Sequence, residues 1–123
     1  MNTPNLINAN SLRIPLADES VQMVACSDPY FGLRDYGLPK TDWPEFSYAP
    51  IAGIPEITIP AWVGCYGLEP TLDMYIGHLV LISRELWRVL RNDGIMFRNW
   101  GDSYNGSGGA GGTARATGSL SDS

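Results

Sequence analysis

The clearest hydrophobic pattern of the chain lies between residues 71 and 91. Apolar side chains recur there at steps of three and four, at positions 72, 75, 76, 79, 82, 86 and 89 or 90. This spacing gives one apolar stripe along an α-helix. Thr71 can cap the start of the helix, and the sequence Asn92-Asp93-Gly94 is typical of a helix end. The pattern therefore predicts a helix over residues 71–91.

Two short apolar runs flank this helix in the sequence. Residues 21–26 form a near-continuous apolar run whose length and β-branched content suit a strand buried on both faces. Residues 95–100 predict a second strand after the helix. A strand, a crossover helix and a strand predict a parallel pair with a right-handed connection. The predicted fold class is therefore α/β, with this pair as half of a Rossmann-like sheet.

Residues 38–68 are predicted to hold no long helix and no central strand. Prolines recur there about once in five residues, at positions 39, 44, 50, 55 and 60, and each removes a backbone donor. Aromatic residues lie among them, which is unusual for a disordered linker. We expect an ordered, irregular insertion over the face where Tyr30 emerges. A ligand-binding lid and a packing flap are its two alternative roles.

The last part of the chain has no apolar periodicity. Seven of the fourteen glycines lie between residues 101 and 118. Residues 106–111 match the pattern G-x-G-x-x-G, but no helical pattern follows them, as a dinucleotide-binding loop would require. Residues 105–123 therefore predict a flexible glycine-rich tail or the start of a truncated region, and residues 1–104 one partial α/β domain.

Composition restricts the partners of such a domain. The chain has 123 residues and a net charge of −5, with thirteen acidic against eight basic residues, which argues against free-standing DNA binding. Two cysteines and one histidine are too few for a structural zinc site, so no metal is expected. No apolar run approaches the roughly 20 residues that span a membrane, and we expect a cytoplasmic protein.

The chemistry-bearing stretch follows the first predicted strand. Residues 24–37 read V-A-C-S-D-P-Y-F-G-L-R-D-Y-G. In open α/β sheets, ligands bind just outside the carboxyl ends of the strands. The stretch resembles the S-P-P-Y motif and its W-G-L-R-D-Y-G continuation in the DNA amino-methyltransferases that modify cytosine N4 or adenine N6. The resemblance continues through residues 14–21, 67–79, 84–94 and 99–104.

This resemblance implies a class I methyltransferase fold, S-adenosylmethionine as methyl donor and DNA as partner, with the target base flipped out of the duplex. The implied catalytic residues are Ser27, Asp28, Pro29 and Tyr30. Ser27 Oγ and the carbonyl of residue 28 would accept the amino hydrogens of the base. Tyr30 would stack on its ring. The S-x-P-Y form favours cytosine N4 over adenine N6.

The chain departs from the family pattern at two points. Aspartate stands at position 28 where the family has proline, so either the backbone carbonyl or the Asp28 carboxylate could be the acceptor. The F-x-G-x-G segment that binds S-adenosylmethionine is absent. The chain thus resembles the N-terminal, catalytic-motif portion of a longer enzyme. An inactive truncated remnant, a non-catalytic interaction module and a methyltransferase acting on a non-DNA substrate are the alternatives.

Other polar residues carry weaker signals. His78 lies next to the apolar stripe of the helix, where a structural, hydrogen-bonded histidine is expected. Glu69 precedes the helix, and a solvated carboxylate is favoured there over a polar contact with the site. Arginines 84, 88 and 91 predict a solvated helix face. Asp102 and Ser103 follow the second strand and are candidates for a secondary polar contact.

Overall fold

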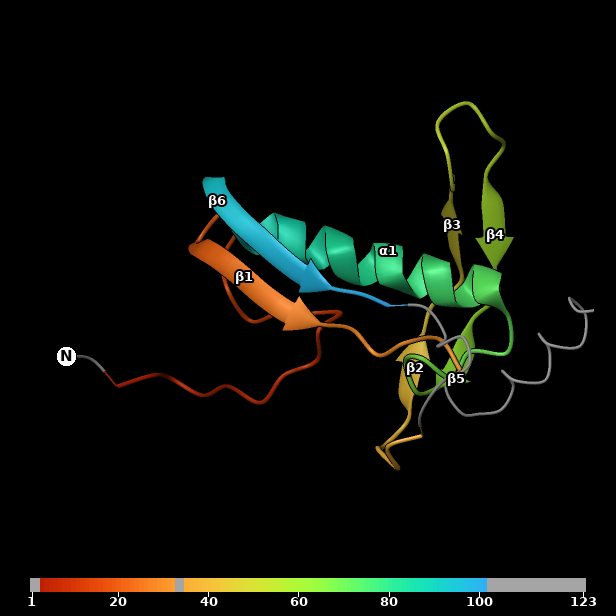
Figure 1. The fold of residues 1–123 in the computed structure, drawn as a ribbon, viewed down its shortest axis with the longest axis horizontal. Helices are drawn as coiled ribbons and strands as arrows, with labels where there is room; N and C mark the ends of the chain where they lie inside the picture. Colours follow the sequence, from red (N-terminus) through yellow and green to blue (C-terminus); the bar gives the residue numbers. More distant parts are fainter. Residues whose placement is uncertain (1–2, 33–34, 102–123) are drawn as a thin grey trace, which may run out of the picture.

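The described part of the chain forms a small α/β structure in which one helix packs against strands β3, β4 and β6 (Figure 1). The computed structural model describes residues 3–32 and 35–101. Strand β1 (Val21–Ser27) is followed by four short strands, then by helix α1 (Leu72–Val89) and strand β6 (Leu90–Asn99). The predicted tail at 105–123, as well as Asp102 and Ser103, lies outside the described residues.

Strands β1 and β6 form the predicted parallel pair, with Met23 opposite Ile95 and Ser27 opposite Asn99. The α/β class and the order strand, helix, strand are therefore confirmed. Within the described residues this sheet has two strands. A larger Rossmann-like sheet stays a prediction.

Helix α1 begins as predicted but ends earlier. The Thr71 side chain caps it by accepting the Met74 N–H at 3.2 Å. Its last turn ends at Val89, and Leu90 is already extended. The predicted helix end at residues 92–94 is wrong, because β6 starts directly after the helix and runs through them. The backbone N–H groups of Glu19 and Ser20 donate hydrogen bonds to the carbonyls of Arg88 and Val89. These bonds satisfy two carbonyl groups at the helix end without a glycine cap.

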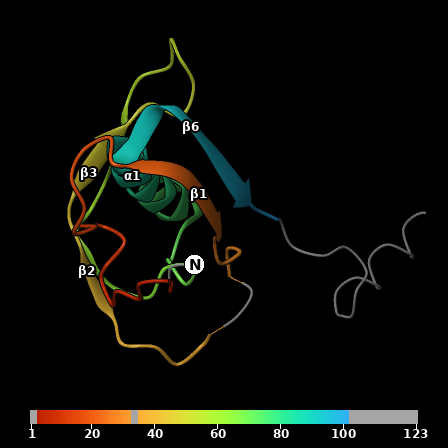
Figure 2. The same cartoon turned by 90° about the vertical axis from the view of Figure 1, so that its left-hand side faces the viewer.

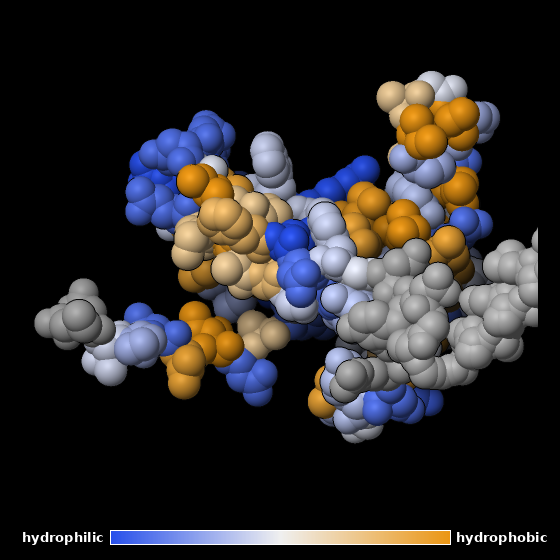
Figure 3. All heavy atoms as spheres, viewed as in Figure 1, coloured by the Kyte–Doolittle hydropathy of each residue, from blue (hydrophilic) through white to orange (hydrophobic). Residues whose placement is uncertain are grey.

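One face of the β1–β6 pair is covered and the other is open. Helix α1 lies behind the pair (Figures 1 and 2). On the opposite face Met23, Ile95 and Phe97 are 58%, 57% and 59% exposed. Figure 3 shows an apolar patch over these strands. The prediction that β1 is buried on both faces is therefore wrong, because no element among residues 3–32 and 35–101 covers this side.

The proline-rich insertion is ordered, as predicted, and folds as an interrupted antiparallel ribbon. Strand β2 (Thr41–Trp43) pairs with β5 (Trp62–Gly64), and β3 (Phe46–Tyr48) pairs with β4 (Ile57–Ile59). Pro44 and Pro60 lie at the two interruptions. These short strands were not predicted, because each is only three residues long and fits between prolines whose spacing argues against longer strands.

The main core lies between this ribbon and the first half of α1. Tyr48, Ile59 and Met74 form a buried cluster. Gly77 allows the ribbon to approach the helix, since a Cβ there would lie 2.5 Å from Ile59 Cδ1 and 2.9 Å from Tyr48 Cε1. Gly77 itself is buried at this contact.

Substitution of Gly77 by alanine tests this close contact. Alanine gains about 1 kcal/mol in helix propensity, but the steric overlap costs about 1–3 kcal/mol in a packed core. We expect the G77A variant to have a lower free energy of unfolding in urea. Trp87→Ala is the control on the same helix, since Trp87 is 73% exposed. A G77A variant more stable than the original chain would contradict this packing.

Candidate active site

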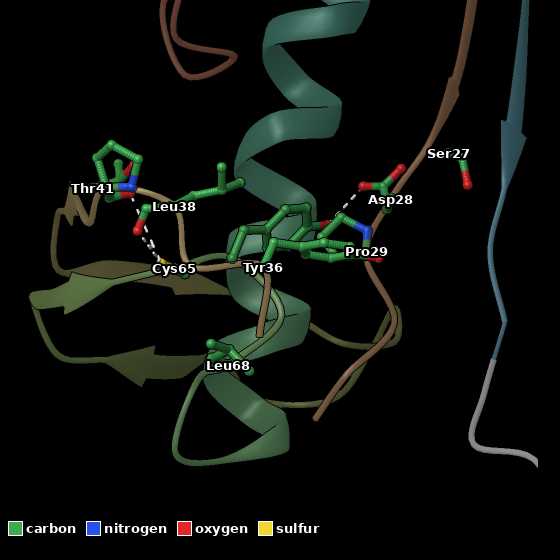
Figure 4. A pocket seen from close by; sticks show the side chains of 10 residues that line it. Ser27, Asp28, Pro29, Tyr36, Leu38, Thr41, Cys65 and Leu68 are labelled. Carbon is green, nitrogen blue, oxygen red and sulfur yellow. Dashed lines mark hydrogen bonds between the residues drawn. The ribbon is translucent and has the colours of Figure 1, made fainter. Parts of the chain in front are cut away.

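A pocket of about 500 Å³ opens at the carboxyl end of β1. Ser27, Asp28 and Pro29 line it on one side (Figure 4). Its other walls come from residues in the segments 36–41 and 65–68, at the two ends of the insertion. The insertion therefore contributes to the wall of the pocket beside the predicted site.

Ser27 and Asp28 point to opposite sides of the strand end. Ser27 is exposed and lies toward β6, where the Asn99 side-chain amide donates to its Oγ at 3.4 Å. Asp28 points toward α1 (Figure 4). This alternation is that of successive residues along an extended strand.

The Asp28 carboxylate is buried in an ion pair with Arg98 of β6. Both side chains are 4% exposed, and Arg98 Nη2 lies 2.6 Å from Asp28 Oδ2. Arg98 Nε donates to the second carboxylate oxygen at 3.3 Å, which makes the contact bidentate. Arg98 also donates to the Ser83 hydroxyl on α1. One guanidinium thus joins the motif, strand β6 and the helix.

The Tyr66 hydroxyl is a further donor to Asp28, at 2.7 Å from Oδ2. Burial raises the pKa of Tyr66 well above its ordinary value, and the hydrogen bond and the charge of Asp28 raise it further. Tyr66 therefore stays a phenol and donates. It belongs to the insertion, so this bond ties the pocket wall to the motif.

Pro29 and Tyr30 continue the loop toward the helix and the end of β6. The Pro29 carbonyl accepts the Tyr75 hydroxyl at 2.7 Å. The ring of Tyr30 lies directly over the backbone of Gly101, where a Cβ would overlap it. Tyr30 is thus next to the pocket rather than in its wall. Ser27, Asp28 and Pro29 meet at the pocket, and Tyr30 turns toward β6.

Sequence reasoning missed Arg98 and Tyr66. Arg98 carried a signal, because a charged residue in the middle of an apolar strand needs a buried counter-ion. Its partner Asp28 lies 70 positions away, so only the strand register identifies it. Tyr66 carried no signal that distinguishes it from the other aromatics of the insertion.

Glu69 and His78 differ from their predicted environments. Glu69 was expected to be solvated, but its side chain is 0% exposed and accepts from His78 Nδ1 at 2.7 Å. His78 is fully buried, as a structural histidine would be. Its Nε2 has no hydrogen-bond partner among the residues that the structure describes.

Three arginines in α1 or just after it, Arg84, Arg88 and Arg91, are exposed or half-buried. Arg84 and Arg91 are exposed, as predicted. Arg88 is half-buried instead, because it binds Asp18, Glu85 and the carbonyls of Ile14 and Leu16. Its guanidinium lowers the pKa of Glu85. Arg88 therefore fixes the segment that leads into β1.

Neither a metal centre nor a membrane span is found in the described part of the chain. No three His, Cys, Asp or Glu side chains gather there in a way that could hold a metal ion. Of the same residues, none belongs to a helix long and apolar enough to cross a bilayer.

The relatives of the chain decide its family. It is 34% identical over 89 residues to the type II methyltransferase M.MwoI of Methanothermobacter wolfeii, across 72% of this chain. It is 30% identical over 106 residues, 85% of this chain, to the type II methyltransferase M.Cfr9I of Citrobacter freundii. The chain belongs to the type II methyltransferase family. The predicted resemblance to this family is thereby confirmed.

The chain spans only part of the length of its relatives. The match covers 10% of M.MwoI and 27% of M.Cfr9I. It covers 24% of the type II methyltransferase M.SmaI of Serratia marcescens, at 32% identity. No family profile and no solved structure matches the chain.

A double-mutant cycle tests the ion pair. Asp28→Asn and Arg98→Met each leave one buried partner uncompensated, which costs about 3–5 kcal/mol of stability. The double variant is expected to lose clearly less than the sum of the two, as measured by urea unfolding. The exposed pair Arg91 and Asp93 is the matched control, where little coupling is expected. Additive losses for Asp28 and Arg98 would contradict the buried pair.

Proposed function

We propose that this chain carries the base-binding residues of a DNA methyltransferase that modifies an exocyclic amino group. The observation that carries the proposal is the difference in surroundings between Ser27 and Asp28 at the end of β1. Both Asp28 carboxylate oxygens are engaged by Arg98, and Oδ2 also accepts from Tyr66. Ser27 is exposed at the same point, beside the pocket. The side chain of Ser27 and the backbone carbonyl of Asp28 are therefore the acceptors that we assign to the base.

The chemistry explains why acceptors are needed. The lone pair of an exocyclic amino group is delocalised into the ring, so the nitrogen is a poor nucleophile. Two acceptors aligned on its hydrogens localise the lone pair on nitrogen and orient it for direct displacement. Positioning then matters more than a strong base. In this proposal Pro29 keeps residue 28 extended, and the Tyr30 ring stacks on the flipped base.

The aspartate at position 28 supports the backbone carbonyl as acceptor. A carboxylate already bound by a guanidinium and a phenol is costly to detach in a buried site. The side chain instead fixes the strand end from which the carbonyl projects. We therefore propose the register in which Asp28 stands for the first proline of the family motif, with cytosine N4 as the favoured target.

S-adenosylmethionine is the methyl donor proposed for the whole enzyme, and it supplies the transferred methyl group when bound. The described residues do not fit its binding site. The pocket beside Ser27 has one acidic side chain, Asp28, and that carboxylate is engaged by Arg98 and Tyr66. No F-x-G-x-G segment occurs in the chain. We assign none of these residues to the donor.

Methylation by the full-length gene product tests the proposal. Duplex DNA incubated with the enzyme and S-adenosylmethionine is hydrolysed to nucleosides and analysed by mass spectrometry. We expect N4-methylcytosine, and a loss of about 10²-fold or more in kcat for Ser27→Ala, because one acceptor in the transition state is removed.

The exposed Thr58→Ala variant is the control for loss of a surface hydroxyl, since the Thr58 hydroxyl bonds the exposed Ser47 hydroxyl in the ribbon. Its rate is expected to stay unchanged. A Ser27→Ala enzyme with full activity would refute the assignment of Ser27. Methylation of protein or small molecules without methylation of DNA would refute the DNA proposal.

A further inference from the structure

Glu69 and His78 form a buried ionisable pair that the proposed base chemistry does not use. His78 is 0% exposed on α1, and its Nδ1 lies 2.7 Å from Glu69 Oε2. Its ring stacks with the indoles of Trp43 and Trp62, with centroids 4.0 Å and 5.8 Å away. Apolar side chains of similar volume usually stabilise such a site equally well, so stability alone does not account for the pair.

The second carboxylate oxygen of Glu69 connects the buried pair to the base-binding loop, residues 28–32, through two successive hydrogen bonds. Glu69 Oε1 accepts the N–H of Gly67 at 2.9 Å, and the Gly67 carbonyl accepts the N–H of Gly32 at 2.7 Å. Gly67 has a φ of +98°, which favours glycine, and a Cβ there would lie 3.0 Å from Pro29 Cβ. The turn that Glu69 fixes therefore touches the loop at both Pro29 and Gly32.

The same face of the helix holds the loop a second time. Tyr75 lies three residues before His78, and its hydroxyl donates to the Pro29 carbonyl at 2.7 Å. Its ring also packs on Phe31, with centroids 5.4 Å apart. The loop backbone on both sides of Tyr30 thus depends on this face of α1.

We propose that Glu69 and His78 are positioning residues that set the backbone of the base-binding loop 28–32 through the Gly67 turn. The proposal rests on the function proposed above. His78 orients the Glu69 carboxylate, the carboxylate holds the Gly67 amide, and the Gly67 carbonyl holds Gly32. In the proposed function the Asp28 carbonyl and the Tyr30 ring contact the same base. The position of the loop that holds both groups must therefore be fixed to within a fraction of an ångström.

The double variant Glu69→Leu/His78→Leu separates positioning from packing. It replaces the buried pair by apolar side chains of similar volume, so we expect the urea midpoint of this chain to stay close to the original. Amide hydrogen exchange at Gly32 and Gly67, followed by NMR, is expected to be about tenfold faster, the factor for loss of about one hydrogen bond. In the full-length enzyme kcat is expected to fall about tenfold, while KM for DNA changes less than about twofold.

Tyr48→Phe is the matched control, because it removes one hydrogen bond to α1, from the Tyr48 hydroxyl to the Asp73 carbonyl, away from the loop. Exchange at Gly32 is expected to be unchanged there. Should the double variant unfold, Glu69→Leu takes its place, since it removes the acceptor of the Gly67 amide and keeps the His78 ring on Trp43. Original exchange rates at Gly32 and Gly67 in the folded variant would overturn the proposal. Faster exchange in a protein whose original form never methylates DNA would instead uphold the positioning pair and refute the proposed function.

Discussion

The buried ion pair between Asp28 and Arg98 is the constraint on which the rest of the site depends. It joins the ends of the parallel strands β1 and β6 at the point where the chain leaves the sheet. A carboxylate and a guanidinium that are each 4% exposed must keep this geometry, because either one alone would be an uncompensated buried charge. Bonds from the same pair to Tyr66 and to Ser83 extend the constraint to the insertion and to α1.

The loop after Asp28 is then held by the helix rather than by the sheet. Tyr75 binds the Pro29 carbonyl, and the buried Glu69 and His78 fix the turn at Gly67 that binds Gly32. The strand ends therefore determine where the loop starts, and α1 determines its path. This division explains why a small α/β unit with a two-stranded sheet can present an ordered loop beside a pocket.

Sequence reasoning identified the elements that depend on local patterns. The start of α1 followed from its cap, and the parallel pair followed from the order of apolar runs. It failed where long-range contacts determine the structure. Strand β6 begins five residues before the predicted start, because Glu19 and Ser20 bind the last helix carbonyls. The motif at 27–30 was found from its residues, whereas Arg98 and the burial of Glu69 depend on strand register and helix packing. The roles of Ser27 and Tyr30 stay predictions.

The most direct test of the central claim is a photochemical cross-link to the target base. DNA with 5-iodocytosine at the position that the enzyme methylates is bound by the full-length protein and irradiated, and the cross-linked peptide is identified by mass spectrometry. Stacking of the flipped base on Tyr30 predicts a cross-link at Tyr30. A cross-link from the target base to a residue outside 27–32, with none at Tyr30, would contradict the assignment of this loop as the base-binding site.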